Sequence, residues 1–186
     1  RGHKIVVEGL EEQFASNHFG HFLLTNLLLD MLKKSTPSRI VVVSSTAYKW
    51  GKIEFDNLNM EKRVDEPFTV YCNTKLSNVL FTKELSRRLQ GTGVTANCVH
   101  PGAVKTEIGR QMNPLLSLLT IPLFKYFLKS SLEGAQTSIH VAVAEHLTTV
   151  SGKYFVDCQE IPLDPIAEDE GLAKKLWEVS EKLTKL

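Results

Sequence analysis

Two short runs of apolar, β-branched residues lie on either side of a long helical pattern. The runs are Arg39–Ser45 (RIVVVSS) and Val94–His100 (VTANCVH). Runs of this length and composition are typical of parallel strands that helices cover on both faces. Between them, from about Phe68 to Gln90, apolar residues recur at three- and four-residue spacings, which predicts a helix. A helix between two strands provides the crossover that a parallel pair requires, so the sequence predicts the α/β class.

The same alternation extends to both ends of the chain. A helical pattern runs from about Glu11 to Lys34, and Gly152–Val156 (GKYFV) predicts a last short strand. Ser130-x-x-Glu133 matches a capping box that opens a further helix, and an amphipathic helix is predicted over Gly171–Leu186. We therefore expect one α/β domain with a parallel sheet and right-handed crossovers.

Composition excludes several kinds of partner. The 186 residues carry 22 Lys and Arg against 21 Asp and Glu, and a net charge of +1 indicates no nucleic-acid partner. Three scattered cysteines, none in a Cys-x-x-Cys pair, favour a reduced compartment over a disulfide framework. The most apolar segment, Leu115–Leu128, contains Pro122 and Lys125 and is too short to span a bilayer. We expect a core or lid helix there, with peripheral contact with lipid as the alternative.

Polar residues and glycine follow the predicted strands at the point where each strand ends. Ser44 and Ser45 end the first strand, and His100, Pro101 and Gly102 end the second. In open parallel sheets, ligands bind in the crevice beyond the carboxyl ends of the strands. We therefore expect these residues to border one ligand-binding crevice.

Tyr71 and Lys75 are four residues apart near the start of the helix that follows the first strand. This spacing places both side chains on one helix face, one turn apart. A phenol ordinarily titrates near ~10, but a neighbouring ammonium favours phenolate. The pair is then suited to exchanging a proton with a carbonyl or alcohol oxygen. For an isolated Tyr-x-x-x-Lys, the alternative is an ordinary, partly exposed helix face.

Two further residues strengthen the first interpretation. Ser45 ends a buried strand, where its hydroxyl can polarise a substrate oxygen, although a plain strand-to-loop turn is the alternative. Asn17 and Gly20 lie within the first predicted helix, where both are unfavourable, and such violations often mark functional positions. For Asn17, the alternative is a buried amide that bonds the backbone.

His18 and His21 could face one metal, but no helical carboxylate has the spacing of a metalloprotease. We expect packing or surface histidines and no metal site.

These motifs together resemble the short-chain dehydrogenase/reductase family. The matching motifs are Asn17-x-x-Gly20-x-Phe22, the strand that ends in Ser44-Ser45, Tyr71-x-x-x-Lys75 and Pro101-Gly102, and they occur in the family's order. The text Gly20–Leu28, Gly51-Lys52-Ile53 and Tyr71–Phe81 is similar to the retinol dehydrogenase-like branch, which also shares a long interval between Ser45 and Tyr71. The resemblance implies the C-terminal part of a Rossmann-type doubly wound parallel sheet.

The resemblance also implies a role for each matching residue. Tyr71 would be the general acid and base, and Lys75 would favour its phenolate form and hold the nicotinamide ribose. Ser45 would position the substrate oxygen, and Asn17 would hold a water in a proton relay. Four residues would contact the nicotinamide, its carboxamide or the phosphates: Pro101, Gly102, Val104 and Thr106. The branch implies NADP as the cofactor, with NAD as the alternative, and a small hydrophobic alcohol or carbonyl such as retinol or retinal as the substrate.

One departure from the family concerns the cofactor-binding turn. The glycine-rich Thr-Gly-x-x-x-Gly-x-Gly turn that holds the pyrophosphate is absent, because Gly91-Thr92-Gly93 precedes a strand. We therefore expect residues 1–186 to be the catalytic and substrate-binding part of a single NAD(P)-binding domain whose N-terminal part is missing. The alternative function is a truncated, catalytically inactive relative that acts as an interaction or regulatory protein. The resemblance further implies homodimers, and a full-length protein at the cytoplasmic face of the endoplasmic reticulum membrane.

Overall fold

A four-stranded sheet lies at the centre of the fold, in the order β3-β4-β5-β6. The computed structural model describes residues 6–7, 9–60, 62, 65–104 and 128–186. β3 (Ser38–Val43) and β4 (Val94–His100) are parallel, with Ser38 opposite Val94, and β5 (Tyr154–Val156) is parallel to β4. These three strands confirm the prediction of an α/β fold with parallel strands.

The fourth strand was not predicted, and it makes the sheet mixed. β6 (Gln159–Glu160) is antiparallel to β5. The two residues between these strands, Asp157 and Cys158, have φ angles of 50° and 62°. Two successive residues in the left-handed region form the kind of tight turn that joins antiparallel strands. Neither residue is a glycine or asparagine, so the turn left little signal in the sequence.

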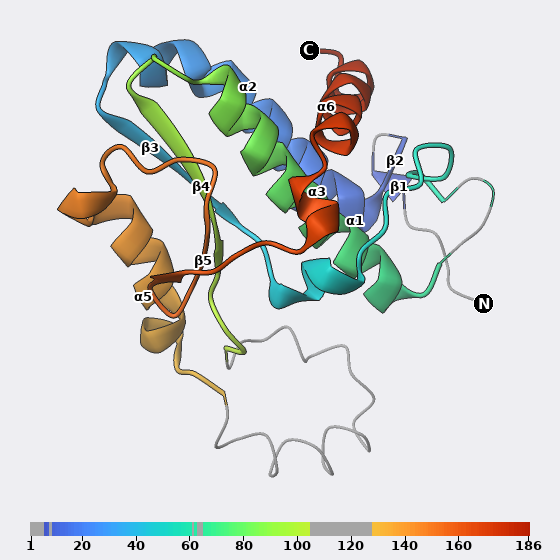
Figure 1. The fold of residues 1–186 in the computed structure, drawn as a ribbon. Helices are drawn as coiled ribbons and strands as arrows, with labels where there is room; N and C mark the ends of the chain where they lie inside the picture. Colours follow the sequence, from blue (N-terminus) through green and yellow to red (C-terminus); the bar gives the residue numbers. More distant parts are fainter. Residues whose placement is uncertain (1–5, 8, 61, 63–64, 105–127) are drawn as a thin grey trace.

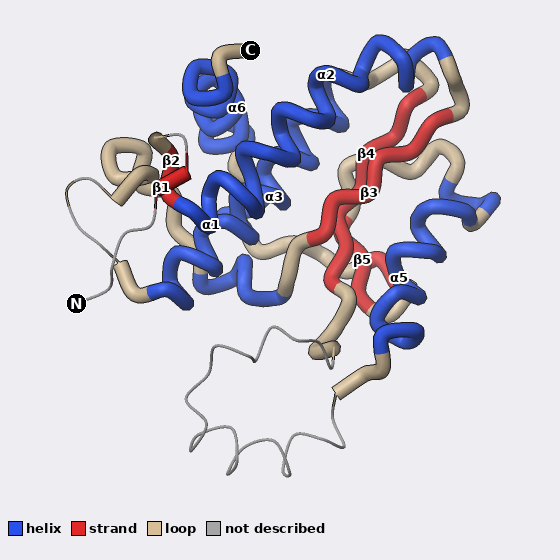
Figure 2. Tube along the Cα trace, turned by 180° about the vertical axis from the view of Figure 1, so that it is seen from behind, coloured by secondary structure: helices blue, strands red, loops and turns tan. Residues whose placement is uncertain are grey.

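Helices cover both faces of the sheet. The described helices and the short N-terminal hairpin have these bounds: β1 (Val6–Val7), β2 (Leu10–Glu11), α1 (Glu12–Phe14), η1 (Ala15–Phe19), α2 (Gly20–Lys34), η2 (Thr46–Trp50), α3 (Pro67–Arg88), α5 (Ser131–Val143), η4 (Glu145–Leu147), η5 (Pro165–Glu168) and α6 (Glu170–Thr184). Figure 1 shows α2, α3 and α6 on one side of the strands and α5 on the other. Figure 2 shows the same two layers from behind.

The larger part of the core lies between β3, β4 and the layer of α2, α3 and α6. Its fully buried members include Phe22 of α2, Leu76 and Leu80 of α3, and Leu176 of α6. A smaller cluster under α5 contains Val99, Val141 and Phe155. Val99 and Phe155 are partners in the β4–β5 register, and their side chains alternate with those that face the larger cluster. β4 is therefore buried on both faces, as its composition predicts, whereas β3 is mostly half-buried.

The first predicted helix contains an interruption at the position where its sequence departs from helix propensity. Residues Ala15–Phe19 form a π-helical turn, η1, in which the Gly20 N–H donates to the carbonyl of Ala15. A Cβ on Gly20 would lie 3.1 Å from that oxygen, so glycine accommodates the wider turn with little crowding. The extra residue changes the direction of the side chains within the turn, Asn17 and His18 among them.

Candidate active site

α3 begins with Pro67 and carries Tyr71 in its second turn and Lys75 in its third. Both side chains are half-buried. The Lys75 Nζ lies 5.5 Å from the centroid of the Tyr71 ring, and it donates to the carbonyl of Val43 at 3.5 Å. Val43 is the last residue of β3, so the ammonium and the phenol lie at the carboxyl end of the sheet.

Burial lowers the pKa of Lys75 from its usual value, against a smaller opposing effect from Cys98. In the part of the chain that the structure describes, Lys75 forms no ion pair with a carboxylate. Apart from the contact with the Val43 carbonyl, its N–H groups therefore have no charged partner among the described residues.

Asn17 reaches the same helix from the π-helical turn. Its Nδ2 donates to the Thr74 Oγ1 at 3.3 Å, and that hydroxyl donates to the carbonyl of Tyr71 at 2.8 Å. The structure thus brings Asn17 to the helical turn that carries Tyr71 and Lys75. The alternative expected for Asn17, a buried amide bonded to backbone, does not describe it, because the side chain is half-buried and bonds a hydroxyl.

Ser45 follows β3 and caps η2, where its Oγ accepts from the Ala47 N–H at 3.2 Å. This bond uses a lone pair of the hydroxyl and leaves its proton for another acceptor. The neighbouring Ser44 is buried, and its Oγ donates to the carbonyl of Lys75 at 2.7 Å. Ser44 therefore ties the end of β3 to α3, and Ser45 lies beside that junction. No hydrogen bond joins Ser45 directly to Tyr71 or Asn17 among the described residues.

Gly51 allows the segment after η2 to lie directly against α3. A Cβ at this position would lie 2.6 Å from the carbonyl oxygen of Cys72 and 2.7 Å from the Cβ of Leu76. Both of these atoms belong to the packed helix, so a larger residue would displace the turn that carries Tyr71. The glycine that matches the retinol dehydrogenase-like branch thus has a local steric role.

The residues after β4 lie at the same end of the sheet. Gly102 has a φ of +89°, a conformation that favours glycine, and a Cβ there would lie 2.9 Å from the side chain of Lys129. Val104 packs on Gly134 in the first turn of α5 and forms a parallel bridge with Lys129. The Lys129 Nζ also contacts the carbonyl of Pro101 at 3.5 Å. Thr106 lies outside the described residues, and so does Leu115–Leu128 except for its last residue.

His18 and His21 do not face one another as metal ligands. His18 is buried, with its Nε2 2.9 Å from the Ser180 Oγ and its Nδ1 3.4 Å from the Asn78 Oδ1. His21 is exposed and bonds the carbonyl of Asn17. Among the residues that the structure describes, no group of three or more His, Cys, Asp or Glu could hold a metal ion.

Burial lowers the pKa of His18 from 6.5 to about 4, in spite of its hydrogen bond with Asn78. Between these two values the unfolded chain binds a proton that the folded protein does not. The free energy of unfolding should therefore fall as the pH falls from 6.5 to about 4, by roughly 3 kcal/mol in all. We expect His18→Gln to remove this contribution, as measured by urea unfolding at pH 7 and pH 4.5. Equal losses of stability on acidification in the two proteins would contradict the prediction.

The structure places three further polar residues around the site, and of these only Ser44, at the end of the first predicted strand, was expected there from the sequence. Ser44, Thr74 and Asn78 are all buried, and each bonds a group in the turn or strand that carries a predicted site residue. Thr74 directly precedes Lys75 in the sequence, which is the one signal that could have indicated it. Asn78 lies one turn after Lys75 on α3, and no pattern in the sequence indicates that its amide is buried beside the site.

Comparison with known proteins gives consistent matches. A family model described as short chain dehydrogenase matches residues 3–115. Retinol dehydrogenase 14 from Mus musculus is 54% identical over 178 residues, which cover 94% of this chain and 52% of that protein. Retinol dehydrogenase 13 from Homo sapiens is 50% identical over 188 residues, covering 99% of this chain and 57% of that protein. The chain thus spans about half the length of the curated relatives it matches.

Solved structures agree with the fold. An uncharacterised protein from Mycobacterium paratuberculosis superimposes with a TM-score of 0.77 at 31% identity, covering 99% of this chain and 63% of that one. The NADPH-bound carbonyl reductase from chicken fatty liver gives a TM-score of 0.58 at 19% identity, covering 86% and 59%. These matches confirm a Rossmann-type α/β fold. None of the described helices has both the length and the apolar character needed to cross a membrane.

Proposed function

Because the chain belongs to the short-chain dehydrogenase family, we propose that it forms the proton-transfer site of an oxidoreductase that interconverts a hydrophobic alcohol and its carbonyl compound. The observation that carries this proposal is the placement of Lys75 beside Tyr71 at the carboxyl end of β3, with Asn17 joined to the same helical turn through Thr74. Ser45 adds a hydroxyl at the end of the same strand.

The chemistry follows from the groups present. The Tyr71 hydroxyl gives a proton to the carbonyl oxygen in reduction and takes it back from the alcohol in oxidation. The Lys75 ammonium stabilises the negative charge that the phenol carries between these events. The Ser45 oxygen accepts the capping hydrogen bond, so its hydroxyl proton remains available. This hydroxyl donates to the substrate oxygen and holds it near the phenol. The Asn17 amide orients a water that connects the site to solvent.

The residues at the carboxyl end of the sheet fit the nicotinamide end of an NAD(P) cofactor. Lys75 offers N–H groups without a carboxylate partner among the described residues, which suits the hydroxyls of a ribose. The left-handed backbone at Gly102, beside Pro101 and Val104, turns the chain at the end of β4, and the Lys129 side chain packs against the face where a Cβ would stand. When bound, the cofactor supplies or accepts the hydride, and the protein supplies orientation and the proton. We propose NADP, with NAD as the alternative, and we extend the contact to Thr106.

We propose retinol and retinal as the example of the substrate pair, because the curated relatives are named retinol dehydrogenases. An aromatic cluster beside Tyr71 supports an apolar substrate. Trp50 is 69% exposed and Phe68 is 62% exposed, and their ring centroids are 6.4 Å apart. Phe68 also stacks on Tyr71 at 6.4 Å. Exposed aromatic rings next to the reacting group offer apolar contact area to a long substrate.

We expect Trp50→Ala to raise the KM for a long apolar alcohol by about tenfold, because the lost ring removes roughly 1–2 kcal/mol of apolar contact. The kcat should stay within about twofold, and the KM for a short alcohol such as a propanol should not change. Steady-state kinetics with a series of alcohols of increasing chain length measures both effects. An equal rise in KM for short and long alcohols would show that the ring does not contact the apolar part of the substrate.

The proposed activity is tested on the longest natural form of the protein that contains this chain. The measurement is the change in nicotinamide absorbance at 340 nm with NADP(H) or NAD(H) and a panel of apolar alcohols and aldehydes. Turnover with one cofactor would support the proposal and settle the choice of cofactor. Binding of cofactor or protein partners without any turnover would support the alternative, a catalytically inactive relative that acts as an interaction or regulatory protein.

A homodimer is also part of the proposal. Leu24, Leu27 and Met31 lie on one face of α2 and are 57%, 69% and 66% exposed, a stripe of the kind that is usually covered in an assembly. We expect sedimentation velocity to show a dimer and Leu27→Glu to shift it to the monomer. A wild-type protein that sediments as a monomer would exclude this arrangement.

We further propose peripheral contact with a membrane at the cytoplasmic face of the endoplasmic reticulum, because the resemblance to the retinol dehydrogenase-like branch implies it.

A further inference from the structure

A row of buried polar groups connects the C-terminal helix to the end of β3. The His18 Nε2 lies 2.9 Å from the Ser180 Oγ of α6, and its Nδ1 lies 3.4 Å from the Asn78 Oδ1 of α3. The Asn78 Nδ2 donates to the carbonyl of Val43 at 3.2 Å, and this is the carbonyl that the Lys75 ammonium contacts at 3.5 Å. His18, Asn78 and Ser180 are each at most 1% exposed.

The protonation state of His18 orients this row. Because burial lowers its pKa to about 4, the imidazole is neutral at physiological pH and carries one N–H. If the Nδ1–H donates to the Asn78 Oδ1, the Nε2 is left to accept the Ser180 hydroxyl proton, and both ring nitrogens are satisfied. The Ser180 hydroxyl also donates to the carbonyl of Leu176 at 2.7 Å, so its one proton is shared between that oxygen and the Nε2. With its oxygen bound to His18, the Asn78 amide must turn its NH2 toward Val43.

His18 also holds the turn that presents Asn17. The two residues are adjacent in the π-helical turn η1, so the position of the buried ring limits the direction of the half-buried amide. The ring packs edge-on against Phe19, with centroids 5.1 Å apart, and edge-on against Phe81 of α3 at 6.2 Å. A π-helical turn departs from ordinary helix geometry and persists where its surroundings hold it in place.

We infer that Ser180, His18 and Asn78 are positioning residues, through which the C-terminal helix holds Asn17 and the carbonyl that binds Lys75 in place for proton transfer. The inference rests on the proposed function for its catalytic consequence. The three side chains are too deeply buried to touch a substrate in the crevice, so they act through Asn17 and Lys75. A displacement of about 1 Å at a reacting group can lower a rate by about a hundredfold.

The kinetic test uses the longest natural form of the protein. We expect Ser180→Ala to lower kcat by about tenfold and His18→Leu by about a hundredfold, with the KM for cofactor and alcohol within about twofold of wild type. His18→Gln should recover most of the loss, because its amide reaches the position of the Nε2 and can bond Ser180. The matched control is Thr184→Val, which removes a hydroxyl of the same helix that bonds only backbone carbonyls among the described residues. Rates are expressed per folded molecule.

A second measurement does not depend on turnover. Backbone amide exchange in residues 15–19 should become about tenfold faster in Ser180→Ala than in wild type, and it should not change in Thr184→Val. Unchanged kcat and unchanged exchange in both Ser180→Ala and His18→Leu would overturn the inference. If the wild-type protein oxidises or reduces no alcohol or aldehyde, the proposed function fails. The exchange measurement then decides by itself whether α6 holds the turn.

Discussion

Replacing Tyr71 with phenylalanine should lower kcat by about a hundredfold to ten-thousandfold in the longest natural form of the protein. The substitution removes the single hydroxyl and leaves the ring, its stacking on Phe68 and its contact with Lys75. Without that hydroxyl, the site loses its acid and base, and such groups contribute roughly 10²–10⁴ to the rate. Cofactor affinity should change by less than about threefold, because Lys75, Gly102 and the remaining contacts stay in place. Stopped-flow absorbance at 340 nm and calorimetric titration with NADP(H) measure the two quantities.

The matched control for this substitution is Tyr154→Phe. Tyr154 lies on β5, is 2% exposed and packs edge-on against Tyr48, at 5.2 Å between ring centroids. Its hydroxyl has no hydrogen-bond partner among the described residues, so its removal costs no bond. We expect kcat unchanged and stability unchanged or slightly higher. If Tyr71→Phe retained more than a tenth of the wild-type kcat, Tyr71 would not be the acid and base, and the proposed mechanism would be wrong.

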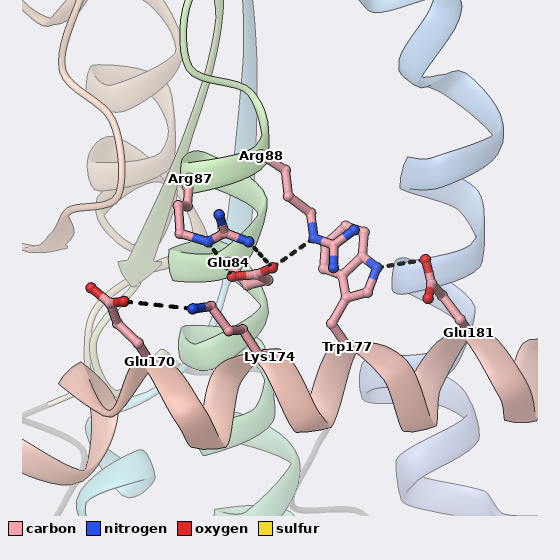
Figure 3. Close-up of polar contacts among 7 residues, drawn as sticks. All are labelled: Glu84, Arg87, Arg88, Glu170, Lys174, Trp177 and Glu181. Carbon is pink, nitrogen blue, oxygen red and sulfur yellow. Dashed lines mark hydrogen bonds and ion pairs between the residues drawn. The ribbon is translucent and has the colours of Figure 1, made fainter.

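Replacing Trp177 with alanine should lower the free energy of unfolding by about 3–5 kcal/mol. Figure 3 shows this ring at the junction of α6 with α3, where the Arg88 guanidinium lies over it at 4.2 Å from the ring centroid and its Nε1 donates to Glu181 at 2.7 Å. The ring also packs against Phe22, at 4.9 Å between centroids, and Phe81, at 5.7 Å. The substitution would therefore leave a cavity between three helices. Urea unfolding followed by circular dichroism measures the loss.

The same residue type at an exposed position serves as the control. Trp50→Ala should change the free energy of unfolding by less than about 0.5 kcal/mol, because its ring is 69% exposed. The two tryptophans should therefore differ in effect. The Trp177 substitution should lower stability, and the Trp50 substitution should raise the KM for long alcohols. A loss below about 1 kcal/mol in Trp177→Ala would show that α6 is held mainly by other contacts.

Glu84 of α3 illustrates a buried charged group that composition could not identify. Its carboxylate accepts from the Arg87 Nε and Nη2 and from the Arg88 Nε, at 2.7–2.8 Å, and its side chain is 2% exposed (Figure 3). The hydrogen bonds from Arg87 are the largest cause that lowers the pKa of Glu84 below its usual value. In the sequence, these residues resemble the solvated end of an amphipathic helix. In the structure α6 packs on α3, and the carboxylate is buried.

Several parts of the fold could be predicted because their signals are local. The strand β4 has the predicted bounds, since a buried parallel strand needs an unbroken apolar run. The helix α5 begins where the capping box of Ser130 and Glu133 indicates, because the cap bonds join residues three apart. The spacing of Tyr71 and Lys75 likewise determines that they share a helix face, whatever surrounds the helix. The roles proposed for Tyr71, Lys75, Ser45 and Asn17 remain predictions that kinetics must test.

Other features depend on contacts between residues that are far apart in the chain. Asn17 and Gly20 indicated from the sequence that the first helix is unusual. They did not indicate that a π-helical turn directs Asn17 toward Thr74. The sequence predicted that His18 is a packing or surface residue. Its contact with Ser180, 162 residues later, makes it a buried, neutral side chain that connects η1 to α6. Local patterns are determined by backbone geometry over a few residues. The direction of a side chain in a packed interior is determined by which distant helix covers it, and only the tertiary structure decided that.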